Sequence, residues 1–89
     1  MGRMSVLKLD YQDAYQLLAR RLKEARELAG LTQVQVAALI QKSQSYVTKC
    51  ETGEKRVDVI ELIIFSKIYQ QDPRFFTEDL FPLVQPFPT

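Results

Sequence analysis

The sequence has no histidine and only one cysteine among its 89 residues. It also contains no glycine-rich phosphate-binding loop and no cluster of residue types that ligate metals. Aspartate and glutamate are plentiful, but their positions fit helix caps and exposed helix faces. The sequence therefore has few of the side chains that enzymes use for catalysis. We therefore expect a protein that is not an enzyme and that uses neither a metal nor another cofactor.

The number of cysteines and the hydropathy of the chain also limit which folds and which cellular compartment are expected. The single Cys50 cannot form an internal disulfide, and we expect it to be a small buried side chain on the inner face of a helix. No apolar stretch reaches the roughly 18 residues of a membrane-spanning helix, and no signal peptide or lipidation motif is present. The expectation is one small cytoplasmic domain without a membrane partner.

The net charge of +1 conceals an uneven distribution of charge along the chain. Residues 20–56 hold eight basic side chains against four acidic ones, whereas residues 57–89 hold two against five and residues 1–19 balance. The middle of the chain therefore suits nucleic acid, and the acidic end can point away from phosphates. Charge alone fits ordinary solvated helix faces equally well.

Residues 30–53 are the most informative segment, because they contain the signals of two short helices with a tight turn between them. Thr32 and Gln35 can form a capping box on the first helix, while Ser43 can cap the second and Gly53 can close it. A short helix, a three-residue turn and a second helix with a polar outer face suit the DNA major groove. Apolar residues recur at helical spacing in both helices: Val36, Ala37 and Ile40, then Val47 and Cys50.

This segment resembles the helix-turn-helix of the lambda-repressor-like (Cro-type, XRE) transcription regulators. The resemblance implies an all-α fold of five helices from about Leu18 to Leu80, with the helix-turn-helix formed by helices 2 and 3. It further implies sequence-specific binding of a double-stranded DNA operator by a regulator, a repressor acting as a homodimer. The residues that carry the resemblance are Leu31-Thr32-Gln33, Val36-Ala37, Ser43-Gln44-Ser45-Tyr46-Val47 and Glu51-Thr52-Gly53.

We divide the chain into a flexible N-terminal arm (1–9), a DNA-binding domain (10–81, motif at 33–52) and a proline-rich tail (82–89). A short fifth helix is predicted from Pro73 to about Phe81, because proline suits the first position of a helix. Three prolines exclude helix from the last eight residues. No segment shows a convincing strand pattern.

Helices 1 and 4 are predicted from their caps and their apolar stripes. Helix 1 starts from a cap at Asp10 or Asp13 and stops at Gly30, and a capping box at 58–61 starts helix 4. Tyr15 is expected at the edge of the inner stripe of helix 1. The residues expected on the two inner faces are Leu18, Leu22, Ala25 and Ala29 in helix 1 and Leu62, Phe65, Ile68 and Tyr69 in helix 4.

By the resemblance, the outer face of helix 3 meets the edges of the DNA bases through Gln44, Ser45 and Lys49, with Thr48 beside them. The chemistry agrees with this assignment. Glutamine can pair with adenine through two hydrogen bonds, lysine can reach the O6 and N7 atoms of guanine, and serine can serve either base. Thr48 occupies a position where a bulky side chain would block the groove. The alternative is that these residues are simply exposed and polar.

The resemblance also assigns phosphate contacts and one structural ion pair. Tyr46 either flanks a phosphate or packs on helix 2. Arg26 and Glu51 match a partly buried salt bridge between helices 1 and 3, for which unconnected surface residues are the alternative. The residues expected at the phosphates are Thr32, Gln33, Ser43, Tyr46, Lys55 and Arg56.

The sequence departs from the family pattern at Gln41, where the turn between helices 2 and 3 usually carries glycine. That position tends to need a positive φ angle, which costs a residue other than glycine roughly 1–2 kcal/mol. Either Gln41 bears this strain or the turn has another shape.

The acidic C-terminal region, which has several aromatic residues, supports a second hypothesis. The chain could be a protein-interaction module, including an antitoxin-like partner of another protein. The same apolar residues could form the homodimer interface, or they could fold back over helices 1 and 4 and complete the core. The residues concerned are Phe75, Phe76, Phe81, Leu83, Val84 and Phe87.

Overall fold

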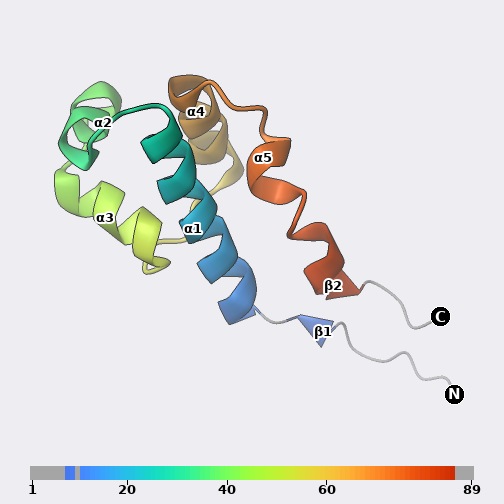
Figure 1. The fold of residues 1–89 in the computed structure, drawn as a ribbon. Helices are drawn as coiled ribbons and strands as arrows, with labels where there is room; N and C mark the ends of the chain where they lie inside the picture. Colours follow the sequence, from blue (N-terminus) through green and yellow to red (C-terminus); the bar gives the residue numbers. More distant parts are fainter. Residues whose placement is uncertain (1–7, 10, 86–89) are drawn as a thin grey trace, which may run out of the picture.

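The structure is a computed structural model that describes residues 8–9 and 11–85, with side chains described from residue 12 to residue 83. Five α-helices follow one another along the chain and share one core (Figure 1). The predicted all-α class with five helices is therefore confirmed. The bounds are Tyr11–Leu28 for α1, Gln33–Ile40 for α2, Gln44–Thr52 for α3, Val59–Tyr69 for α4 and Arg74–Thr77 for α5.

The long helix α1 is the centre of the packing. Helices α3, α4 and α5 contact it directly, and α2 packs against α3 (Figure 1). Ala29 was wrongly predicted to lie on the inner stripe: α1 ends one residue earlier, and Ala29 is exposed. Every helix contributes to the core, which consists of Leu18, Leu22, Ala25, Val36, Ala37, Val47, Cys50, Phe65, Tyr69 and Phe76. Ile40, Leu62 and Ile68 lie partly buried at its margin.

Cys50 is buried in this core, as predicted. Burial raises the pKa of its thiol to about 11, because the apolar surroundings disfavour the thiolate. Among the helices of the described residues, none is long and apolar enough to cross a membrane.

Both predicted capping boxes are present. The Thr32 hydroxyl accepts from the Gln35 amide at 3.1 Å, and the Gln35 side chain accepts from the Thr32 amide at 2.8 Å. Asp58 and Glu61 make the equivalent pair of bonds at the start of α4, at 2.8 and 2.9 Å. Each box satisfies two amides that the first turn of a helix leaves without a partner. These local bonds define where α2 and α4 begin.

Gln41 has φ 59° and ψ 45°, so the left-handed conformation expected from the family turn is confirmed. Its amide donates to the Ala37 and Ala38 carbonyls, which closes the C-terminus of α2. Gln70 ends α4 in the same way, with φ 57°, although no pattern in the sequence indicated it. Two helices thus end on a glutamine in a conformation that favours glycine.

The C-terminal helix was predicted too long. Helix α5 ends at Thr77, and a separate 3-10 helix, η1, covers Phe81–Leu83. Pro82 lies within η1, so the expectation that proline excludes helix from the tail is wrong there. Proline is tolerated in a first turn, because its missing N–H would have no partner at that position.

A two-residue ladder joins the predicted N-terminal arm to the predicted C-terminal tail. Strand β1, Lys8–Leu9, pairs antiparallel with β2, Val84–Gln85 (Figure 1). Two residues are too few to show the alternation of polar and apolar residues that predicts a strand, so the sequence could not indicate β1 and β2. Asp10, one proposed cap of α1, lies outside the described residues. The other, Asp13, lies inside the first turn of the helix and is therefore not its cap.

The ion pair expected between Arg26 of α1 and Glu51 of α3 is present and nearly buried. Arg26 Nε lies 2.7 Å from Glu51 Oε2 and Arg26 Nη2 lies 3.1 Å from Oε1, with 12% and 4% of the two side chains exposed. Arg26 Nη1 also donates to the Leu31 carbonyl at 2.9 Å. The bond with Glu51 raises the pKa of Arg26. One guanidinium thus connects α1, the following loop and α3.

Replacing either left-handed glutamine with glycine should be neutral or stabilising by up to about 1 kcal/mol. Glycine relieves the strain of the positive φ angle but adds entropy to the unfolded chain. The variants are Gln41→Gly and Gln70→Gly, with Ala38→Gly as a control in the exposed interior of α2, where glycine should cost about 1 kcal/mol. Urea unfolding followed by circular dichroism measures the three changes. A loss above 1 kcal/mol at Gln41 would reveal a role for its side chain.

Glu51→Ala should lower the free energy of unfolding by roughly 3–5 kcal/mol, because the buried guanidinium of Arg26 loses its counter-charge. The double variant Arg26→Met with Glu51→Met should lose less than the single variant. Arg74→Ala removes an exposed ion pair with Asp72 and should change stability little. Chemical denaturation compares these proteins. If Glu51→Ala cost as little as Arg74→Ala, the pair would not be a structural anchor.

Candidate nucleic-acid interface

Helix α3 presents an exposed polar face at the surface of the domain. Gln44, Ser45 and Lys49 are exposed on it, whereas Thr48 is half-buried. Ser43 caps the helix, and its hydroxyl accepts from the Tyr46 amide at 3.1 Å. The opposite face of α3 holds the core residues, so the helix cannot rotate without exposing them. The residues predicted to face bases therefore lie on the outer side of a fixed helix.

Gln33, at the first position of α2, connects this face to the buried ion pair. Its side-chain nitrogen donates to Glu51 Oε1 at 3.0 Å. Its oxygen accepts from the Thr48 hydroxyl at 2.8 Å and from the Gln44 nitrogen at 3.4 Å. The last bond is long and therefore weak, so the Gln44 amide can exchange it for another partner. A chain of hydrogen bonds runs from Arg26 through Glu51 and Gln33 to the outer face of α3.

Tyr46 connects α3 to α4, and together with Ile40 of α2 it borders one hollow on the surface. Its hydroxyl donates to Glu61, and the ammonium groups of Lys42 and Lys55 lie over its ring, at 5.2 and 5.4 Å from the ring centre. Burial and the bond to Glu61 raise the pKa of Tyr46. A phosphate contact by Tyr46 stays a prediction, which the position of its hydroxyl makes less favourable.

Glu61 has a structural role that the sequence revealed only in part. It forms the predicted capping box, but it also receives bonds from Tyr46 and from Lys55, whose Nζ lies 3.3 Å from its Oε2. Burial raises the pKa of Glu61, but the bonds from Tyr46, the Asp58 amide and Lys55 outweigh it and leave the pKa lowered. No local pattern could show this role, because Tyr46 and Lys55 belong to other segments.

Lys55 and Arg56 are held by internal contacts in the loop after α3. Besides Glu61, Lys55 Nζ donates to the Arg56 carbonyl at 3.2 Å. The Arg56 guanidinium lies over the ring of Tyr15, 4.8 Å from its centre. Both cations are therefore positioned next to α3 by aromatic and acidic neighbours from α1, α3 and α4.

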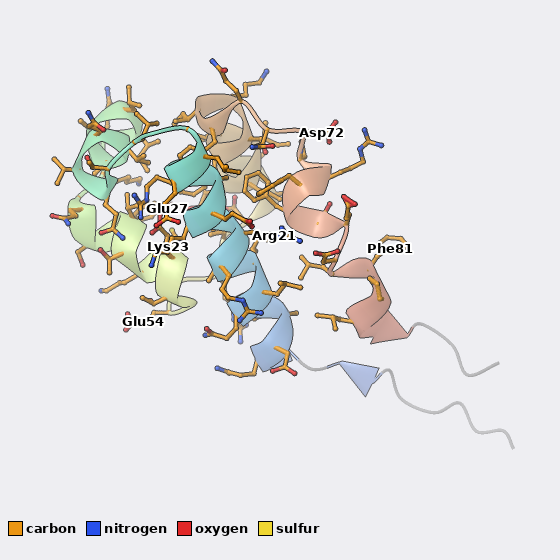
Figure 2. The ribbon with its side chains drawn as sticks, viewed as in Figure 1. Arg21, Lys23, Glu27, Glu54, Asp72 and Phe81 are labelled. Atoms are coloured by element: carbon orange, nitrogen blue, oxygen red, sulfur yellow. The ribbon has the colours of Figure 1, made fainter. Side chains whose placement is uncertain are left out.

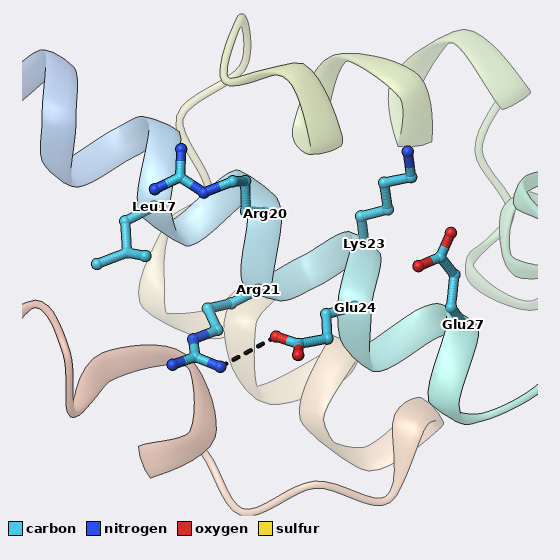
Figure 3. Close-up of a pocket in the computed structure, with 6 residues that line it drawn as sticks. All are labelled: Leu17, Arg20, Arg21, Lys23, Glu24 and Glu27. Atoms are coloured by element: carbon cyan, nitrogen blue, oxygen red, sulfur yellow. Dashed lines mark hydrogen bonds and ion pairs between the residues drawn. The ribbon is translucent and has the colours of Figure 1, made fainter.

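The excess of basic residues in the middle of the chain is partly neutralised by the fold. Arg21 bonds to Glu24 at 3.0 Å and to Asp79, in the same way that Arg26 and Lys55 have acidic partners. Figure 3 shows the outer surface of α1 around a shallow hollow, which three basic residues line together with two acidic ones: Arg20, Arg21, Lys23, Glu24 and Glu27. This surface has the mixed charge of a solvated helix face. The basic residues that the sequence predicts at the DNA, Lys49, Lys55 and Arg56, lie elsewhere, on α3 and in the loop that follows it.

Comparisons with known proteins agree with this geometry. A family model described as a helix-turn-helix domain matches residues 17–74. An XRE-family like protein from Pseudomonas syringae pv. tomato str. DC3000 is 38% identical, with a TM-score of 0.71, over 82% of this chain and 89% of that one. The restriction-modification controller protein C.AhdI from Aeromonas hydrophila is 29% identical, with a TM-score of 0.65, over 74% of this chain and 98% of that one.

No curated protein matches the chain. The family model covers more than half of the sequence, and the Pseudomonas protein is closely similar over most of its own length. The chain therefore belongs to the XRE-type helix-turn-helix family of DNA-binding transcriptional regulators.

Proposed function

We propose that this regulator is a repressor that reads one half-site of its operator with α3 in the major groove. The observation that carries the proposal is the exposed polar face of α3, held in place by hydrogen bonds from Gln33 and the buried Glu51. A fixed helix with amide, hydroxyl and ammonium groups on its outer side is what direct base readout requires. Repression follows if the bound protein covers a promoter.

Gln44, Ser45 and Lys49 are proposed to contact base edges. Gln44 can leave its weak bond to Gln33 and pair with an adenine, and Lys49 can reach the acceptors of a guanine. Thr48 offers its methyl group, because its hydroxyl already donates to Gln33. Methyl groups contact the C5-methyl group of thymine favourably. The four side chains together span the few base pairs of one half-site.

The phosphate contacts are proposed on both sides of α3. The start of α2 contributes Thr32 and Gln33, and the start of α3 contributes Ser43. Helix N-termini attract anions through their free amides. The loop contributes Lys55 and Arg56, with Tyr46 as a weaker candidate because its hydroxyl is bound to Glu61. Such contacts position the protein without selecting a sequence.

We further propose that two copies bind a two-fold symmetric operator. One recognition helix reads only a few base pairs, so a dimer with half-sites one DNA turn apart is needed to select a site. The second hypothesis, a protein-interaction module built on the C-terminal aromatics, receives less support. Phe76 is fully buried and Phe75 packs against it, at 5.2 Å between ring centres. Among the described side chains of that group, Phe81 is the most exposed, at 85% (Figure 2), and Val84 and Phe87 have no described side chains.

Gln44→Ala and Lys49→Ala should each weaken binding to the preferred site by roughly 1–3 kcal/mol and relax the preference at one base position. Arg74→Ala, which removes an exposed charge from α5, should leave both unchanged. Fluorescence anisotropy on the preferred duplex and on single-base variants measures the effect. Equal losses on preferred and random DNA would mean that both side chains act only on phosphate.

Arg56→Ala should weaken binding to preferred and random duplexes by the same factor. The reason is that a phosphate contact carries no sequence information and releases a counterion. The slope of log affinity against log salt concentration should fall by about 1. A titration series between low and moderate salt gives this slope, with Arg74→Ala again as the charge-matched control. An unchanged slope would assign Arg56 to packing on Tyr15 alone.

A further inference from the structure

Lys42 lies in the turn between α2 and α3, directly before the cap of α3. Its amide donates to the Ala37 carbonyl at 2.9 Å, which fixes its backbone on the end of α2. The next residue, Ser43, is fixed by the bond between its hydroxyl and the Tyr46 amide. The backbone of Lys42 therefore has a defined position at the start of α3, although its side chain is exposed.

The ammonium group of Lys42 is held by an aromatic ring rather than by a carboxylate. Its Nζ lies 5.2 Å from the centre of the Tyr46 ring, and it forms no salt bridge with any other residue that the structure describes. Glu61 borders the same surface hollow, but its carboxylate already accepts from Tyr46 and Lys55. An aromatic ring attracts a cation without cancelling its charge, as a carboxylate would. Lys42 therefore keeps its positive charge for an anion outside the protein.

Arg56 is the corresponding cation beyond the other end of α3. Its guanidinium is also held over a ring, that of Tyr15, 4.8 Å from the centre. Helix α3 has nine residues, so at 1.5 Å per residue it is roughly 13 Å long, close to the roughly 12 Å width of the major groove. A phosphate backbone borders each side of that groove. Cations beyond the two ends of α3 can therefore meet phosphates on opposite sides of it.

We propose that Lys42 binds a phosphate of the operator and that the ring of Tyr46 positions it to do so. This inference rests on the proposed function, because it takes α3 as the helix in the major groove. An ammonium group has three N–H donors, so Lys42 can face the ring on one side and a phosphate oxygen on the other. Holding the lysine beforehand reduces the entropy that it loses on binding. Tyr46 thus acts through its ring, since its hydroxyl is bound to Glu61.

The salt dependence of DNA binding tests the phosphate contact. Lys42→Ala should weaken binding to preferred and random duplexes alike, by roughly five- to tenfold at about 0.1 M salt, and should lower the slope of log affinity against log salt concentration by about 1. Lys42→Arg keeps the charge and should keep the slope. Lys67→Ala is the matched control, because it removes another exposed lysine, from the last turn of α4. Fluorescence anisotropy with the full-length protein measures all four proteins.

The phosphate itself can be located with duplexes in which one phosphate at a time is replaced by an uncharged methylphosphonate. The wild-type protein should lose affinity at every contacted position. Lys42→Ala should become insensitive at one position in each half-site and keep its sensitivity at the others, because the two partners of one contact are not additive. Lys67→Ala should show the wild-type pattern. A variant that merely folds poorly cannot lose sensitivity at a single position.

The positioning role of Tyr46 is tested by removing Lys42 in two backgrounds. Tyr46→Phe removes the bond to Glu61 but keeps the ring, so the loss of affinity caused by Lys42→Ala should persist in it. Tyr46→Leu removes the ring, and the loss caused by Lys42→Ala should shrink by about two- to fivefold. Circular dichroism checks that each variant is folded. A loss of the same size in both backgrounds would contradict the positioning role.

Three outcomes would overturn the phosphate contact. They are a slope that Lys42→Ala changes no more than Lys67→Ala does, a loss confined to the preferred duplex, or a Lys42→Arg variant that binds as weakly as Lys42→Ala. Failure of the proposed function gives a different result. Binding without any sequence preference, with a slope that Lys42→Ala still lowers, would refute base reading by α3 and support the phosphate contact of Lys42.

Discussion

The buried ion pair between Arg26 and Glu51 is the interaction on which both the fold and the site depend. A buried pair of this kind adds little net stability, because desolvation offsets most of the attraction, but neither charge tolerates the loss of the other. The main effect of the ion pair is therefore to fix the positions of the segments that it connects. Arg26 ties α1 to the loop at Leu31 and to α3, and Glu51 passes the constraint to Gln33. Gln33 then orients Thr48 and Gln44 on the proposed DNA-facing side.

A second set of contacts fixes the other side of α3. Tyr46 and Lys55 both converge on Glu61, whose own position is set by the capping box at the start of α4. Helix α3 is thus attached to α1 and α2 at one side and to α4 at the other.

The sequence predicted those features that local chemistry determines. The capping boxes at Thr32 and Asp58 and the buried stripe residues of helices 1 to 4 depend on neighbours a few positions apart. For Gln41 the family pattern left two alternatives, and the structure shows the left-handed one. The resemblance to a family supplied the ion pair of Arg26 and Glu51, which lie 25 residues apart. Features that depend on distant segments without such a pattern were missed, namely the bond of Tyr46 to Glu61 and the pairing of β1 with β2. The burial of Phe76 was one of two alternatives that the sequence left open.

The central claim is that α3, held by Glu51 and Gln33, reads DNA bases in a two-fold site. Selection of bound duplexes from a random pool tests it most directly, with the wild-type protein and the Lys49→Ala variant run in parallel. The account predicts that the wild type selects a two-fold symmetric sequence with half-sites one helical turn apart. The variant should select the same sequence with the preference lost at one symmetric pair of positions. A pool without a consensus, or a consensus that Lys49→Ala leaves unchanged, would contradict it.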